Sequence, residues 1–150
     1  MTQPSRRKVL AFGIAAPLAL TLARRASATT EAMRAAMDDF TAGAAVTEGR
    51  VTLEIPLLVE NGNAVPMTVS VESPMTEDDH VTTIAVFNEL NPLPDVIRFH
   101  FTPQSGRAMA ATRIRLSGTQ AVTAIARMSD GSLWSATTDV IVTAPACAES

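Results

Sequence analysis

The spacing of hydrophobic residues changes near residue 49. Before that point, apolar side chains recur at intervals of three and four residues, at Met33, Ala36, Met37 and Phe40. This spacing predicts an amphipathic helix over Glu31 to Phe40, with Thr30 placed to cap it and Gly43 after its end. The apolar stripe fits packing against the helix's own domain or against a partner, and the pattern leaves both open.

After Gly49 hydrophobic and polar positions alternate, which predicts β-strands. Seven such segments lie at about 51–55, 65–71, 81–87, 97–101, 109–116, 121–128 and 133–143. Turn-forming residues separate them, among them Glu60-Asn61-Gly62-Asn63 and Ser129-Asp130-Gly131-Ser132. Pro56 and Pro66 cannot donate to a strand ladder, so we expect edge-like or bulged strands at those two points.

Seven short strands with one helix outside them predict an all-β fold. Such strands bury their apolar faces as a two-sheet β-sandwich of about 95 residues, with a small barrel as the competing architecture. The Cys…Trp…Cys spacing of antibody domains is absent from the sequence, so the pattern indicates the sandwich architecture only.

The N-terminal segment has the composition of an export signal. Paired arginines, Arg6 and Arg7, precede an apolar run over about 9–23, and Ala26-Ser27-Ala28 offers a cleavage site. The run is shorter than the roughly 20 residues that span a bilayer, so we expect no stable membrane insertion. We therefore predict a twin-arginine signal peptide over 1–28 and a periplasmic protein; a short buried helix preceded by chance arginines is the alternative.

Removal of this segment changes the charge. Five of the twelve basic residues and none of the fifteen acidic ones lie in 1–28, so cleavage leaves a net charge of −8. Nucleic acid and anionic lipid are poor candidate partners, because both are negatively charged and the mature chain is acidic and has no basic patch. The remaining chain is long enough for one domain with a core, so we divide it into a helix and linker (29–48), a sandwich (49–143) and a tail (144–150).

Most polar residues of the chain do not form a candidate site. His80 and His100 stand alone, and Glu77-Asp78-Asp79 lacks the alternating ligands of a calcium loop, so we predict no metal. Four serines lack the context of a nucleophile: Ser73, Ser105, Ser117 and Ser132. Trp134 fits a core or interface position, and Arg113 with Arg115 fits an exposed strand face. We therefore predict no catalytic residues and no cofactor.

The chain contains one cysteine, Cys147, three residues before its last residue. An unpaired cysteine in an exported protein indicates a bond to another molecule or covalent chemistry. Glu149 and the terminal carboxylate disfavour the thiolate, so the pKa of Cys147 should be no lower than that of a free thiol, about 8.5. We therefore expect Cys147 to be reachable but not activated by its own tail.

A set of short motifs carries a family resemblance: Ile55-Pro56, Glu60-Asn61-Gly62, Val65-Pro66, Asn91-Pro92, Thr112-Arg113-Ile114-Arg115-Leu116, Met128-Ser129-Asp130-Gly131-Ser132 and Val142-Thr143. In this order and spacing the chain resembles SoxY, the sulfur carrier of the thiosulfate-oxidising Sox system, from about Met33 to Cys147. The resemblance implies a periplasmic, immunoglobulin-like sandwich that pairs with a SoxZ-like β subunit. It also implies that Cys147 holds sulfur intermediates covalently and presents them to Sox enzymes, without being an enzyme itself.

The tail departs from the family pattern. The family has Gly-Gly-Cys-Gly-Gly, whereas this chain has Pro145-Ala146-Cys147-Ala148-Glu149-Ser150, which should make a stiffer arm. The span from Thr143 to Cys147 is at most roughly 13 to 14 Å. Three hypotheses remain: a sulfur carrier in thiosulfate oxidation, a related protein serving another sulfur substrate or partner, and a binding module that dimerises through Cys147.

Overall fold

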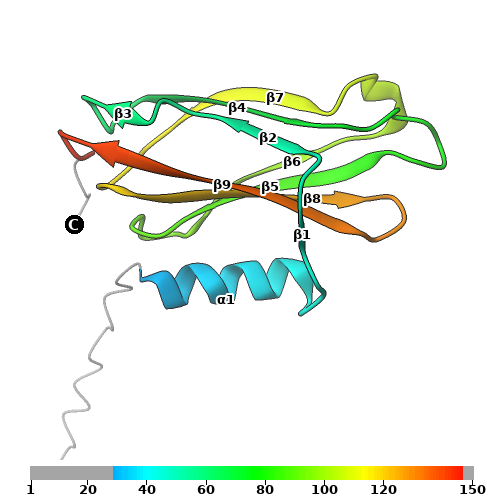
Figure 1. The fold of residues 1–150 in the computed structure, drawn as a ribbon, viewed down its shortest axis with the longest axis horizontal. Helices are drawn as coiled ribbons and strands as arrows, with labels where there is room; N and C mark the ends of the chain where they lie inside the picture. Colours follow the sequence, from blue (N-terminus) through cyan, green and yellow to red (C-terminus); the bar gives the residue numbers. More distant parts are fainter. Residues whose placement is uncertain (1–28, 147–150) are drawn as a thin grey trace, which may run out of the picture.

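The computed structural model describes residues 29–146 (Figure 1). The predicted signal peptide over 1–28 and the residues 147–150, with Cys147, lie outside the described residues. In chain order the elements are α1 (Thr30–Thr41), β1 (Thr47–Glu48), β2 (Val51–Glu54), β3 (Leu58–Val59), β4 (Val65–Val71), β5 (Val81–Asn88), β6 (Asp95–His100), the 3-10 helix η1 (Pro103–Ser105), β7 (Met109–Ile114), β8 (Gln120–Met128) and β9 (Leu133–Val142).

The strands form two sheets, which confirms the predicted β-sandwich. The larger sheet has the order β1-β9-β8-β5-β6, with β3 also paired to β9, and the smaller has the order β2-β4-β7. The two short strands β1 and β3 run parallel to β9, and the other pairs are antiparallel. All seven predicted strands are present; β1 and β3 are additional, because two-residue strands have no periodicity to detect.

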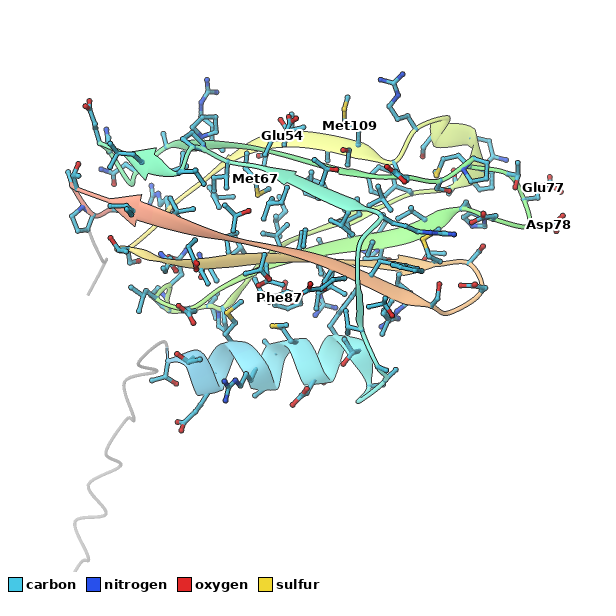
Figure 2. The ribbon with its side chains drawn as sticks, viewed as in Figure 1. Glu54, Met67, Glu77, Asp78, Phe87 and Met109 are labelled. Atoms are coloured by element: carbon cyan, nitrogen blue, oxygen red, sulfur yellow. The ribbon has the colours of Figure 1, made fainter. Side chains whose placement is uncertain are left out.

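The core between the sheets is built from the inward positions of each strand. In β4, Val65, Met67, Val69 and Val71 are buried, and Figure 2 shows Met67 pointing into the space between the sheets. From the other sheet, Ile84, Val86 and Val122 meet them in the same apolar cluster. Glu54 and Met109 lie on the outer face of the smaller sheet, so the alternation separates core from surface as expected (Figure 2).

Helix α1 covers the outer face of the larger sheet, as a third layer (Figure 1). Its residues Met33 and Phe40 are buried against Phe87, Ile125 and Leu133. The helix therefore packs on its own domain, which decides between the two alternatives left open by the sequence. This second covered face also explains why the residues of β5 from Ile84 to Asn88 are all buried.

The ends of the helix differ slightly from the prediction. The N-cap is Thr29 rather than Thr30, because the Thr29 side chain accepts a hydrogen bond from the backbone N–H of Ala32 at 3.2 Å. The helix ends at Thr41, and the C-cap residue Ala42 takes a left-handed conformation with a φ of 53°.

Phe40 has a polar as well as an apolar environment. Its ring centroid lies 5.9 Å from that of Phe87, and the guanidinium groups of Arg98 and Arg127 lie 5.2 and 4.6 Å from it. Arg127 also donates a hydrogen bond to the Phe40 carbonyl oxygen. Stacked cations and a buried ring together attach the end of the helix to β6 and β8.

The expected edge-like position is present at Pro66, where β4 is paired on one side only, but not at Pro56. Pro56 lies between β2 and β3, outside any strand, and Pro66 lies in β4, the central strand of its sheet. Pro66 is tolerated there because the pairing of β2 with β4 ends at Thr68, so no ladder bond to β2 is lost.

We predict that Phe40→Ala lowers the free energy of unfolding by about 3 to 5 kcal/mol, because it removes a buried ring and both cation–π contacts. Chemical denaturation of the full chain measures this loss. Arg34→Ala, on the exposed face of the same helix, is the control and should change stability by less than about 0.5 kcal/mol. Equal effects of the two substitutions would contradict the packing described for α1.

Candidate functional site

The candidate site is the end of the sandwich at which the described chain stops. There β3 adds to β9 as a parallel strand, and the hydrogen bonding continues past both strands. The Thr143 N–H donates to the Val59 carbonyl oxygen at 2.9 Å, and the Gly62 N–H donates to the Ala144 carbonyl oxygen at 2.8 Å. The segments 57–62 and 141–146 therefore run side by side up to the last described residue.

A third segment joins them at Gly62. The Leu116 N–H donates to the Gly62 carbonyl oxygen at 2.8 Å, and the Ala146 N–H donates to the Leu116 carbonyl oxygen at 3.0 Å. We call this arrangement of Gly62, Leu116, Ala144 and Ala146 the Gly62 clasp. Its bonds join backbone groups of three separate segments and attach the tail to the sandwich as far as Ala146.

The clasp requires glycine at position 62. A Cβ atom there would overlap the Leu116 carbonyl oxygen and lie 2.7 Å from the Ala146 nitrogen. Both neighbours are backbone atoms, which cannot rotate away as a side chain would. The close approach of two other segments therefore explains this glycine better than the turn chemistry that the sequence suggested.

The side chain of Asn91 stabilises the segment that carries Leu116. It donates to the Arg115 carbonyl oxygen at 2.8 Å and accepts from the Ser117 N–H at 3.3 Å and hydroxyl at 3.1 Å. Thr119 accepts from the Val142 N–H at 3.0 Å and so links the same loop to β9. Asn91 belongs to a motif of the family resemblance, and the structure gives it this local role.

The clasp changes the expected geometry of the arm. From the sequence we expected a tail starting after Thr143. Instead, Ala144 and Ala146 are both hydrogen-bonded, and Ala146 is only 7% exposed. Cys147 follows directly but lies outside the described residues, so its position is inferred only from the covalent chain.

Large aliphatic side chains are exposed beside the clasp. Leu57, Leu58 and Ile141 are 66, 59 and 55% exposed, and Leu58 and Ile141 are register partners across β3 and β9. Paired residues point to the same side of a sheet, so Leu58 and Ile141 form one apolar surface, and the exposed Leu57 directly precedes Leu58 in the chain. We call Leu57, Leu58 and Ile141 the aliphatic patch. Contiguous exposed apolar residues are typical of a protein contact.

The structure does not bring the other polar residues into a site. Within 29–146 no three His, Cys, Asp or Glu residues are grouped so that they could hold a metal ion. His80 bonds the Thr76 carbonyl oxygen and His100 bonds the Thr83 hydroxyl, in separate local contacts. Glu77 and Asp78 extend from the opposite end of the sandwich (Figure 2).

The remaining candidates have structural roles. Trp134 donates from its indole N–H to the Ser132 hydroxyl at 3.2 Å, and Arg50 stacks over its ring at 4.9 Å. In the same hairpin, hydrogen bonds from Ser132 hold the pKa of Asp130 below its ordinary value. Arg113 and Arg115 are exposed and, within the described part of the chain, form no ion pair.

The described residues thus define a small β-sandwich with an anchored C-terminal tail. The sequence model of the family described as "Sulfur oxidation protein SoxY" matches residues 37–147, well over half of the chain. The chain therefore belongs to the SoxY family. The matched span ends at Cys147.

Solved structures confirm the fold. The sulfur carrier protein SoxY from Chlorobium limicola f thiosulfatophilum is similar with a TM-score of 0.64 and 24% identity, over 77% of this chain and 99% of that chain. Superoxide reductase (neelaredoxin) from Ignicoccus hospitalis is similar with a TM-score of 0.56 and 20% identity, over 63% of this chain and 80% of that chain. Superoxide reductase from Nanoarchaeum equitans has a TM-score of 0.54 and 16% identity, over 64% of this chain and 100% of that chain. At these identities the likeness shows the fold alone.

A comparison with curated proteins gives no match. Among the residues from 29 to 146, no helix has the length and apolar character needed to cross a membrane.

Proposed function

We propose that the protein is a covalent sulfur carrier of the Sox system, in which Cys147 holds the cargo and enzymes of the system load and unload it. The observation that carries this proposal is the family match, which extends through the anchored tail to Cys147. The absence of a second cysteine supports it, because no internal disulfide can compete for the thiol.

The chemistry of loading needs a partner. When the Cys147 thiol forms an S–S bond with thiosulfate, one proton and two electrons are released. We assign the electrons to a redox enzyme that acts as acceptor, and the proton to a base of that enzyme, because the neighbouring Glu149 does not favour the thiolate. On this account the protein positions the sulfur and the partner enzymes catalyse the reactions.

We further propose a periplasmic location, reached by the twin-arginine route through residues 1–28, and a stable heterodimer with a SoxZ-like β subunit. The paired Arg6 and Arg7, the following apolar run and Ala26-Ser27-Ala28 support export. The family membership supports the β subunit.

The loading enzymes should dock on the aliphatic patch. The chain is hydrogen-bonded up to Ala146, and Cys147 is the next residue in the sequence. An enzyme that reaches this sulfur has to cover the surrounding surface, and Leu57, Leu58 and Ile141 are its exposed apolar part. Burial of such side chains favours association.

We predict that protein isolated from thiosulfate-grown cells carries an added mass on Cys147, removable by a thiol reductant. Intact mass spectrometry with peptide mapping measures it, and Cys147→Ser is the control that should carry none. A wild-type protein that shows only a reducible dimer, or no added mass, would contradict the carrier proposal and favour the binding-module hypothesis.

We also predict that Leu58→Asp lowers the fraction of Cys147 that carries sulfur in such cells, because a charge replaces an apolar contact of the docked enzyme. The matched control is Met109→Asp. Met109 is also exposed, at 47%, but it lies at the far end of β7 from the clasp. Equal sulfur loading in Leu58→Asp and wild type would refute docking on the patch, provided that both react equally with a small thiol reagent.

A further inference from the structure

The Gly62 clasp determines how much of the tail can move. Without the clasp, the free chain would begin after Thr143, and Cys147 would lie up to roughly 13 to 14 Å from the sandwich. With it, the last fixed backbone atoms belong to Ala146, and the Cα atom of Cys147 lies about 3.8 Å further along the chain. The clasp therefore removes roughly 10 Å of reach.

We propose that Gly62 is a positioning residue for the sulfur arm: by admitting the tail to the Leu116 carbonyl, it fixes the root of the arm at Ala146. This inference rests on the proposed function only in naming the cargo as sulfur. It adds to the proposed function the residue at which the arm is anchored to the sandwich.

Three observations on separate residues support the clasp. Gly62 is the one glycine of those described at which an added Cβ would come within 3.0 Å of backbone. Ala146 is buried, whereas the two residues before it, Ala144 and Pro145, are exposed. Asn91 separately holds the loop that presents the Leu116 carbonyl.

A nitroxide spin label tests this proposal, because Cys147 is the only cysteine and takes the label alone. We expect the labelled full chain to give an electron paramagnetic resonance spectrum with a slow-motion component, since the preceding residue is fixed. Gly62→Ala should lose that component, because its Cβ displaces Leu116 and Ala146 from the clasp.

The matched control is Gly118→Ala, at the same end of the molecule. Its added Cβ would meet only the Cδ1 atom of Leu90, at 3.1 Å, and a flexible side-chain end can move aside. This variant should keep the slow component. A thermal melt of each variant separates positioning from folding, because a purely structural role for Gly62 would lower the melting temperature without changing the label's motion in the folded protein.

A second variant keeps the test decisive if Gly62→Ala does not fold. Ala146→Pro removes the N–H that donates to the Leu116 carbonyl oxygen, and the substitution lies beyond the last strand, so the sandwich should form. It too should lose the slow component. The proposal is overturned if the wild type shows no slow component, or if a folded clasp variant retains it. Neither result depends on sulfur loading, so this test and that of the carrier function can fail separately.

Discussion

The Gly62 clasp joins three segments that are far apart in the sequence, and the geometry of the candidate site depends on it. A glycine between β3 and β4, the carbonyl after β7 and the tail after β9 meet through backbone hydrogen bonds of 2.8 to 3.0 Å. Each bond contributes only about 0.5 to 1.5 kcal/mol. Together they close the end of the sandwich and determine where the chain that carries Cys147 leaves it.

The rest of the fold makes this end rigid. The larger sheet is buried on both faces, by the smaller sheet on one side and by α1 on the other. Because β9 lies in this sheet, between β8 and the short strands β1 and β3, the tail starts from a well-supported strand. The described residues thus support the tail and offer an apolar surface beside it, while the only thiol of the chain follows immediately after. A supported tail, an apolar surface beside it and a single thiol after it fit a protein that holds a reactive group for other proteins to act on.

Much of the fold could be predicted from the sequence because it depends on side-chain periodicity. Strands such as β4 and β6 alternate apolar and polar residues, and the helix shows its stripe in Met33 and Phe40. The missed features depend on main-chain contacts. The strands β1 and β3 exist only through pairing with β9, and the cap could be assigned to Thr29 rather than Thr30 only from its hydrogen bond.

At the site, Cys147 could be chosen from its chemistry alone, and its role stays a prediction. The clasp could not be predicted, because Gly62 looked like an ordinary turn residue and its partners contribute only backbone atoms.

The central claim is that the tail stays bound to the sandwich up to the residue before Cys147. Amide hydrogen exchange of the full chain, resolved by residue with NMR, tests it most directly. If the claim is correct, the N–H groups of Gly62 and Ala146 exchange at least about tenfold more slowly than free amides, since exchange requires the clasp to open. If Ala146 exchanges at the rate of a free amide while the strand amides of β9 remain protected, the clasp does not hold the arm and the account is wrong.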